Sequence, residues 1–280
     1  MRIAITGSNG QLGRALQREL AGQSLMPIDL PEYDITDLGA ITAAVRTYAP
    51  DLIVHTAAIT DVDGCERDPD LAYRVNVLGT RNIAVAAQQS AAAMVYIGTD
   101  YVFDGTQQAP YREDDAPNPL SVYARTKWLG EEYTRRLVNR HYIVRVAWLY
   151  GDGPRNFVRT VLRLADERES VSMVTDEWGS PTYAEDVASA LVRLVAQPAY
   201  GTYHLPNDGV CSRYDWAAEI LRLAGRTGDL QLVPSQNYQR LARVPGHVEM
   251  RNYNGAEVGV TMRPWQEALR DYMGQQGLLA

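Results

Sequence analysis

The sequence predicts an α/β fold, a doubly wound parallel sheet accompanied by a smaller α/β lobe. Two observations support this prediction. Short apolar runs alternate with amphipathic helical stretches through the first part of the chain, as in a sheet that carries helices on both faces. A glycine-rich turn, Thr6 to Gly13, stands between the first apolar run and the first helical stretch. The 280 residues suffice for one large core and a smaller lobe.

The expected elements follow one another in a regular order. Strands are expected at residues 2–6, 25–29, 52–56, 94–99 and 142–148. Helices are expected between them at 13–20, 41–48, 70–92 and 121–140, and a later helix, 183–196, should return to cover the sheet. Pro50 ends the second helix, since proline cannot continue one. After Gly151 the pattern becomes irregular, and the chain beyond residue 204 should build most of the second lobe.

The first strand leads into the glycine turn with the spacing G-x-x-G-x-x-G, formed by Gly7, Gly10 and Gly13. Glycines permit a tight turn and a close approach to a pyrophosphate, and the N-terminus of the following helix offers free N–H groups to phosphates. An ordinary glycine-rich loop is the alternative, but the position between a strand and an amphipathic helix favours a dinucleotide. Residues 1–150 and about 183–204 are therefore expected to form a Rossmann-type NAD(P)-binding domain, and about 151–182 and 205–280 a substrate lobe.

Asp29 ends the second expected strand, sixteen residues after Gly13. An acidic residue at this place binds the hydroxyls of the adenosine ribose and repels a 2′-phosphate. Residues 30–34 contain no Lys or Arg. The sequence therefore favours NADH over NADPH, although the nearby Arg14 leaves NADPH open.

Tyr123 and Lys127 stand four residues apart in the expected helix 121–140. This spacing places both side chains on one helix face, where the ammonium should lower the phenol pKa from its usual value of about 10. Tyr123 is then expected to act as a general acid or base. The pair alone is weak evidence, because an exposed helix can carry it by chance.

Together these stretches resemble the extended branch of the short-chain dehydrogenase/reductase superfamily, and within it the dTDP-4-dehydrorhamnose reductase family. The resemblance rests on motifs that follow in the same order: Gly10 to Gly13, Ala57 to Asp63, Thr99 to Gly105, Asn156-Phe157 and Gly179 to Tyr183. It extends from Met1 to about Asp215. Farther on, the family has an Arg-Pro pair followed by a Leu-Asp segment. This chain instead has the sequence Arg-Val-Pro-Gly-His-Val from Arg243 to Val248.

The resemblance implies a reaction. NADH or NADPH would deliver a hydride to C4 of a dTDP-linked 4-keto-6-deoxyhexose, which converts dTDP-4-dehydro-L-rhamnose to dTDP-L-rhamnose for cell-surface polysaccharides. Tyr123 would donate the proton, and Thr99 would hydrogen-bond the carbonyl oxygen. Lys127 would bind the nicotinamide ribose and influence Tyr123.

The candidate contact residues fall into two groups. Those expected to bind the cofactor are Gly7, Asn9, Gly10, Gln11, Leu12, Gly13, Asp29, Asp34, Ile35, Ala57, Ala58, Thr60, Asn76, Tyr123 and Lys127. Those expected to bind the substrate are Asp61, Val62, Asp100, Val102, Phe103, Trp148, Arg155, Asn156, Arg159 and Trp178. The two arginines are candidates for the substrate pyrophosphate because a guanidinium binds phosphate with two parallel hydrogen bonds. Arg213 and Arg243 are the alternatives, and ordinary structural roles remain open for Asn76 and both tryptophans.

Three other activities deserve comparison. Nucleotide-sugar 4,6-dehydratases follow the threonine with an Asp-Glu pair, whereas this chain has Asp100-Tyr101, so dehydration lacks its base. NAD-dependent epimerases need only the tyrosine and a tightly held cofactor, and they stay open. A regulatory subunit of the methionine adenosyltransferase type also shares the fold, and turnover of a keto sugar would exclude it.

Composition narrows the partners. The net charge of −7 argues against nucleic-acid or anionic-membrane binding, because both need a broad basic face. The sequence contains no apolar run near 18 residues and no basic leader before an apolar segment, so we expect a cytoplasmic protein. Its two cysteines and four histidines have no metal-ligand spacing, and no metal is expected. A homodimer is compatible with these features.

Overall fold

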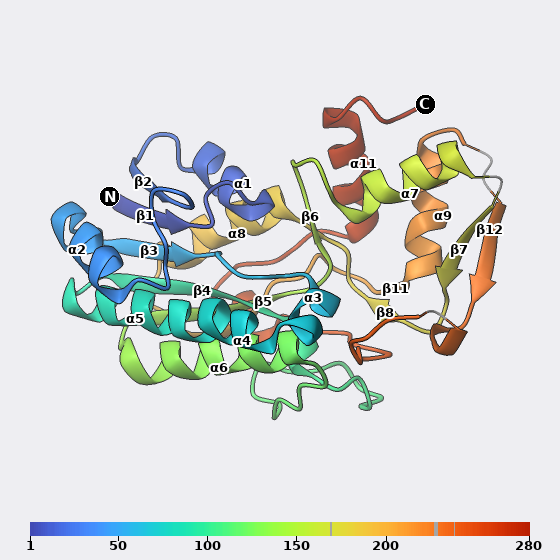
Figure 1. Ribbon diagram of the computed structural model, residues 1–280. Coiled ribbons are helices and arrows are strands. Elements are labelled where there is room, and N and C mark those ends of the chain that lie inside the picture. The colour runs from blue at the N-terminus through green and yellow to red at the C-terminus, as the bar shows by residue number, and fades with distance from the viewer. Residues whose placement is uncertain (169, 227–228, 238) are drawn as a thin grey trace.

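The computed structural model describes residues 1–168, 170–226, 229–237 and 239–280. At its centre lies a six-stranded sheet in the order β10-β5-β4-β3-β1-β2 (Figure 1). All neighbouring strands in this sheet are parallel. The strands are β1 (Arg2–Thr6), β2 (Ser24–Ile28), β3 (Leu52–His55), β4 (Ala93–Thr99), β5 (His141–Val146) and β10 (Gly201–His204). The predicted fold class is confirmed.

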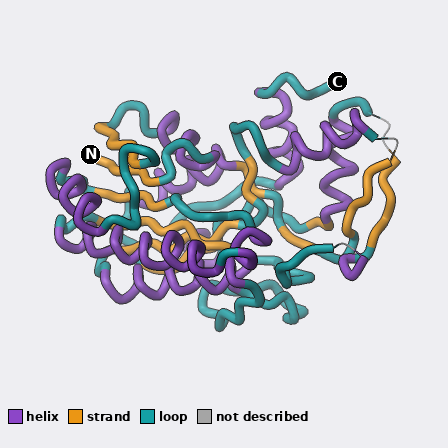
Figure 2. Tube along the Cα trace, viewed as in Figure 1, coloured by secondary structure: helices purple, strands orange, loops and turns teal. Residues whose placement is uncertain are grey.

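Helices cover both faces of the sheet (Figure 2). On one face α1 (Gln11–Glu19) packs against α8 (Ala184–Val195), and on the other α5 (Thr80–Gln89) lies between α2 (Leu38–Tyr48) and α6 (Val122–Leu137). Successive residues of β1 supply the two cores, because side chains alternate across a strand: Ile3 and Ile5 pack with α1 and α8, while Ala4 packs with α2 and α5.

The helix expected at 70–92 is present as one continuous helical stretch, but it is not α-helical throughout. The structure has α4 (Pro69–Ala72), a π-helical segment η1 (Tyr73–Gly79) and then α5, preceded by α3 (Val62–Arg67). Asp68 caps α4 by accepting a hydrogen bond from the backbone N–H of Leu71. In η1 the side chain of Asn76 hydrogen-bonds both the N–H and the carbonyl of Ile59. A π-helical turn changes the direction of side chains on a helix, which is typical of functional sites.

The segment after Gly151 is more regular than the sequence suggested. It contains α7 (Phe157–Glu167) and β7 (Ser170–Val174), which pairs in parallel with β12 (Asp229–Val233). With α9 (Arg213–Leu223) and α11 (Trp265–Gln275) these elements form a lobe at one end of the sheet (Figure 1). Its core contains Tyr150, Trp216 and Tyr272.

Short elements complete the described chain. They are β6 (Leu149–Tyr150), β8 (Trp178–Gly179), β9 (Thr182–Tyr183), β11 (Cys211–Ser212), α10 (Tyr253–Glu257) and the 3₁₀ turns η2 (Asp100–Val102) and η3 (Ser235–Asn237). No helix among the described residues is long and apolar enough to cross a membrane.

Candidate active site

A cavity of about 1030 Å³ opens at the carboxyl ends of β1 to β4, between the sheet and the lobe. The chain passes from β2 on one side of β1 to β3 on the other, and ligands of doubly wound sheets bind at such a switch point. Most of the predicted site residues line this cavity: Gly7, Asn9, Gly10, Gln11, Leu12, Asp29, Asp34, Ile35, Ala57, Ala58, Thr60, Val62, Thr99, Asp100, Tyr123, Lys127, Trp148 and Arg155.

The glycine turn has the shape of a phosphate cradle. Gly7 has a φ of +64°, and a Cβ there would lie 2.8 Å from the Ala57 backbone. A Cβ on Gly13 would lie 2.3 Å from the Gly7 carbonyl oxygen, so Gly13 allows α1 to approach the turn although it lies outside the cavity wall. Both positions therefore require glycine, and the backbone remains open to a pyrophosphate at the start of α1.

Asp29 follows β2 directly at the cavity wall. Its two carboxylate oxygens accept hydrogen bonds from the backbone N–H groups of Asn9, at 2.8 Å, and Leu30, at 2.9 Å. The carboxylate is thus fixed beside the glycine turn. Arg14 donates from Nε to the carbonyl of Asn9, so one guanidinium is also attached to this turn.

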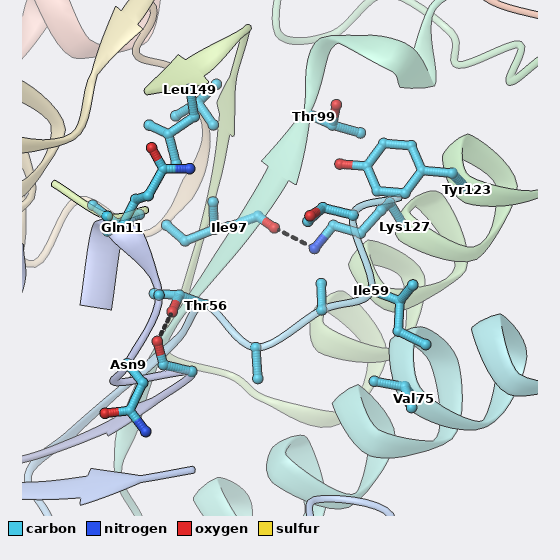
Figure 3. Close-up of a pocket in the computed structure, with 18 of the residues that line it drawn as sticks. Asn9, Gln11, Thr56, Ile59, Val75, Ile97, Thr99, Tyr123, Lys127 and Leu149 are labelled. Atoms are coloured by element: carbon cyan, nitrogen blue, oxygen red, sulfur yellow. Dashed lines mark hydrogen bonds between the residues drawn. The ribbon is translucent and has the colours of Figure 1, made fainter. Parts of the chain in front are cut away.

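Tyr123 and Lys127 project from α6 into the cavity opposite the glycine turn (Figure 3). The helix begins at Ser121, whose hydroxyl accepts a hydrogen bond from the N–H of Ala124. One turn separates the two side chains, as their spacing predicted. The Lys127 ammonium donates to the carbonyl oxygen of Ile97 at 2.7 Å, and burial lowers its pKa to about 8.

The expected effect of Lys127 on Tyr123 is wrong for the protein alone. Burial raises the pKa of the Tyr123 phenol well above its usual value, and the Asp100 carboxylate raises it further, while the nearby Thr99 hydroxyl acts in the opposite direction. The ammonium of Lys127 contacts the Ile97 carbonyl instead of the phenol. Tyr123 therefore holds its proton at neutral pH, in the form that a general acid requires.

Thr99 ends β4 and lies on the cavity wall with Tyr123 and Asp100. Its hydroxyl donates to a carboxylate oxygen of Asp100 at 3.0 Å and accepts from the N–H of Tyr101. Asp100 is 3% exposed, and burial raises its pKa to about 7. The hydrogen bond with Thr99 and the charge of Arg213 lower this pKa and so offset part of the effect of burial. A buried carboxyl group with a raised pKa thus lies on the same cavity wall as Tyr123.

Arg213, which the sequence offered only as an alternative, lies on the cavity wall. Its guanidinium carbon lies 3.5 Å from the centre of the Trp148 ring and 5.4 Å from that of Phe157. Its Nε lies 3.9 Å from a carboxylate oxygen of Glu177. An arginine held on aromatic rings at a cavity wall is well placed to bind an anionic group.

Several candidate substrate contacts lie outside the cavity wall. Val102 and Phe103 are fully buried in a small core, and the ring of Phe103 stacks on Tyr111 at 4.2 Å. Asp61 caps α3, and Trp178 is 39% exposed. These residues support the site from behind or from its rim, and their contact with substrate stays a prediction.

Two further candidates hold α7 in place. Asn156 caps this helix, and its amide nitrogen donates to the carbonyl of Gly151 and the hydroxyl of Tyr272. Arg159 donates to the side chain of Gln276 at 2.6 Å. Both are occupied within the lobe, so their roles in binding also stay predictions.

Asn76 lies behind the cavity wall, where its amide nitrogen also donates to the hydroxyl of Thr126 on α6 at 3.1 Å. Because the same side chain holds Ile59, it connects the loop after β3 to the helix that carries Tyr123. Separately, no group of three metal-ligating side chains occurs in the described part of the chain.

Comparison with known proteins identifies the family. The family model described as the RmlD substrate binding domain matches residues 1–277. A dTDP-4-dehydrorhamnose reductase from Aggregatibacter actinomycetemcomitans is 34% identical over 96% of this chain and 97% of its own length. The chain belongs to the dTDP-4-dehydrorhamnose reductase family. It is thus an NAD(P)H-dependent oxidoreductase.

Two other relatives agree with this assignment. The spore coat polysaccharide biosynthesis protein SpsK of Bacillus subtilis is 36% identical over 98% of both chains. The crystal structure of dTDP-4-dehydrorhamnose reductase from Bacillus anthracis, in complex with NADP, is 38% identical and covers 98% of this chain and 99% of its own, with a TM-score of 0.95. The sequence-based resemblance is confirmed over nearly the whole chain, beyond the point near Asp215 where its motifs end.

Proposed function

We propose that this protein reduces the C4 keto group of dTDP-4-dehydro-L-rhamnose, or of a closely related dTDP-4-keto-6-deoxy sugar, to the corresponding alcohol. The observation that carries the proposal is one continuous cavity. It extends from the glycine turn, past Thr99 and Tyr123, to Arg213 on the lobe. A cofactor, a proton donor and a nucleotide sugar can therefore meet in it, in a chain of the reductase family.

The residues of the cavity fit a nicotinamide cofactor, which supplies a hydride when bound. The glycine turn provides free backbone N–H groups at the start of α1 for the pyrophosphate. Asp29 would accept hydrogen bonds from the adenosine ribose, and Lys127 would donate one to the nicotinamide ribose. The small side chains of Ala57 and Ala58 leave room between these two positions.

Tyr123 would act as the acid in this reaction. Its raised pKa keeps the phenol protonated until a stronger base, the oxygen of the reduced carbonyl, forms beside it. The Thr99 hydroxyl would hydrogen-bond the same oxygen and stabilise the negative charge that develops on it. The proton then passes from Tyr123 to that oxygen, and the product is an alcohol.

The nucleotide part of the substrate would lie on the lobe side of the cavity, formed by residues from about 151–182 and 205–280. Arg213 and the exposed Arg155 both line the cavity there. Arg213 is the stronger candidate for the pyrophosphate, because its guanidinium is already fixed on the Trp148 ring. Arg159 is directed to Gln276 instead.

Asp29 supports a preference for NADH. A carboxylate held by two backbone N–H groups cannot turn away from a 2′-phosphate without losing both hydrogen bonds. Arg14 lies near the turn and would favour NADPH, but its Nε is directed to the Asn9 carbonyl.

The decisive experiment mixes the purified protein with NADH or NADPH and enzymatically generated dTDP-4-dehydro-L-rhamnose. We expect reduced nicotinamide absorbance to fall only when the sugar is present, and Tyr123→Phe to abolish most of this loss. Nuclear magnetic resonance of the product reports the configuration at C4. Inversion of a sugar without net cofactor consumption would instead identify an epimerase. Cofactor binding without any sugar turnover would favour a regulatory protein.

A further inference from the structure

Glu177 occupies a buried position on the lobe side of the cavity. It directly precedes β8, and the antiparallel pairing of β8 with β11 sets it opposite the start of α9. There the backbone N–H of Arg213 donates to the Glu177 carbonyl at 3.2 Å. The Glu177 side chain is only 4% exposed, so its carboxylate is a buried charge that needs positive partners.

Two arginines from different segments supply that positive charge. One carboxylate oxygen of Glu177 lies 3.9 Å from Nε of Arg213, and the other lies 2.8 Å from Nη2 of Arg240. A single carboxylate therefore holds two guanidinium groups that would otherwise repel each other. Both groups act on the cavity wall, where burial raises the pKa of the Tyr101 phenol and the charges of Arg213 and Arg240 lower it.

The Arg213 guanidinium keeps its phosphate-binding edge available in this arrangement. Glu177 faces Nε at a distance longer than a hydrogen bond, and the Trp148 ring lies on the other contact of the group, 3.5 Å from its central carbon. In the described part of the chain neither terminal nitrogen of Arg213 donates a hydrogen bond. A phosphate can therefore approach both terminal nitrogens without displacing Glu177.

A segment that we call the strap, residues 240–248, crosses from the lobe to the Rossmann domain (Figure 1). Asp63 on α3 fixes it by accepting hydrogen bonds from the backbone N–H groups of Leu241, at 3.1 Å, and Ala242, at 2.9 Å. The residue before Asp63, Val62, lines the cavity. The strap is therefore attached at the edge of the cavity on the Rossmann side.

The strap is also attached to the lobe beside Glu177. Trp178, the next residue, donates from its N–H to the carbonyl of Gly246 at 2.8 Å and accepts from the N–H of Val248 at 3.0 Å. Arg243 is exposed, so part of the strap is open to solvent. The strap thus joins the two sides of the molecule, and the Glu177 carboxylate is the point at which it meets the arginine of the cavity wall.

We propose that Glu177 is a positioning residue that couples docking of the strap to binding of the substrate pyrophosphate. Its carboxylate orients Arg213 at the cavity and holds the strap through Arg240. An anion at Arg213 and a docked strap then stabilise each other, because each favours the same arrangement of the carboxylate and the two guanidinium groups. The inference rests on the proposed function, in which Arg213 binds the pyrophosphate of a nucleotide sugar.

Glu177→Gln tests the coupling, because it keeps the shape of the side chain and removes its charge. We expect KM for the nucleotide sugar to rise by about tenfold or more, the effect of losing one interaction with a charged group. The values of kcat and of the affinity for NADH should change far less. Glu219→Gln is the matched control, since it removes a carboxylate that pairs with Arg222 on the exposed side of α9, and it should leave all three quantities unchanged.

Limited digestion with trypsin reports on the strap without any turnover. Trypsin cleaves after arginine, the strap contains Arg240 and Arg243, and mass spectrometry identifies each cut. We expect dTDP to slow cleavage after Arg243 in the wild type and in Glu219→Gln. In Glu177→Gln this cleavage should be faster, and dTDP should not slow it even at a concentration that calorimetry shows to be saturating.

A second variant keeps the inference testable if Glu177→Gln fails to fold. Arg240→Met leaves Glu177 beside Arg213 and removes the guanidinium that connects it to the strap. Cleavage after Arg243 should then become independent of dTDP, and KM for the nucleotide sugar should rise. Circular dichroism establishes that each variant is folded.

The outcomes separate the coupling from the proposed function. The coupling is refuted if the folded variants keep the wild-type KM and trypsin sensitivity, or if Glu177→Gln weakens NADH binding as much as sugar binding, which indicates a purely structural role. A lower KM in Glu177→Gln refutes it as well, because the carboxylate then competes with the substrate. If the wild type turns over the sugar but dTDP leaves strap cleavage unchanged, only the coupling is wrong. If the wild type neither binds dTDP nor turns over the sugar, the proposed function is wrong too.

Discussion

The ammonium of Lys127 donates its hydrogen bond to the carbonyl of Ile97, 2.7 Å away on β4. It also lies 4.4 Å from the centre of the Tyr96 ring, and the Tyr96 hydroxyl donates to the backbone carbonyl of Lys127. The lysine is therefore fixed to the sheet before any ligand arrives. A fixed ammonium can orient a ribose hydroxyl without having to move, which is the form of preorganisation that active sites use.

Replacement of the proton donor tests the mechanism most directly. Tyr123→Phe keeps the ring and removes the hydroxyl, so we expect turnover to fall by about 10²-fold or more, the usual contribution of a general acid. Affinity for the cofactor should change little, since the chain still holds the glycine turn and Lys127. Stopped-flow measurement of the first turnover together with fluorescence titration of the cofactor checks both statements. Near-normal turnover would contradict the assignment of Tyr123.

We expect the buried His55 to make the unfolding free energy depend on pH. Its ring is buried between the hydroxyls of Thr6, at 2.6 Å, and Thr80, at 2.9 Å, and burial together with the Lys127 charge lowers its pKa to about 3. The unfolded chain, with a histidine pKa of about 6.5, binds more protons between pH 6.5 and 3. The stability contribution of neutral His55 is complete above pH 6.5 and is lost as pH falls through that window.

Urea unfolding at several pH values between 7.5 and 4.5 measures this effect. The unfolding free energy should decrease with falling pH in the wild type and decrease less steeply in His55→Gln, which keeps an amide for both threonines. The difference between the two proteins isolates His55 from the carboxylates and from His204, whose pKa is also lowered to about 3. Parallel pH curves would show that His55 is not the responsible group.

The sequence predicted β1 to β5 but missed the edge strand β10. The central strands of a parallel sheet are the easiest to predict because they are buried on both faces. Their apolar runs are continuous and easy to recognise, and β1 matches the expected Arg2 to Thr6. The π-helical η1 escaped prediction because its hydrogen-bond shift depends on contacts such as that of Asn76 with Ile59. Helix α7 was missed because the turn residues around Gly151 obscure its start, although Asn156 is a typical N-cap.

The same contrast applies to the site. Tyr123 and Lys127 share one helix, so their spacing alone places them together. Arg213 contacts Trp148 and Phe157, both of which lie far from it in the chain. Only the packing of the lobe brings these three side chains together, and no local pattern in the sequence predicts this contact.

We expect the negative charge of Asp29 to favour NADH over NADPH. Asp29→Ala should raise KM for NADH much more than KM for NADPH, because it removes ribose hydrogen bonds from one cofactor and a repulsion from the other. Asp29→Asn is the matched control. It removes the charge but keeps an oxygen that can accept the Asn9 N–H, so it should improve NADPH use without disturbing the glycine turn. An equal response of both cofactors would place Asp29 away from the adenosine ribose.

We expect the substrate pyrophosphate to bind at Arg213. Arg213→Ala should reduce kcat/KM for the nucleotide sugar. The loss of transition-state binding free energy should be about 1.5 to 3 kcal/mol, the range for a hydrogen bond to a charged group. NADH binding should stay unchanged. Arg213→Lys should also reduce it, because an ammonium cannot reproduce the planar guanidinium and its stacking on Trp148. Arg163→Ala, on the exposed face of α7, is the control. If Arg213→Ala behaves like that control while Arg155→Ala or Arg159→Ala loses activity, the pyrophosphate binds at the start of α7 instead.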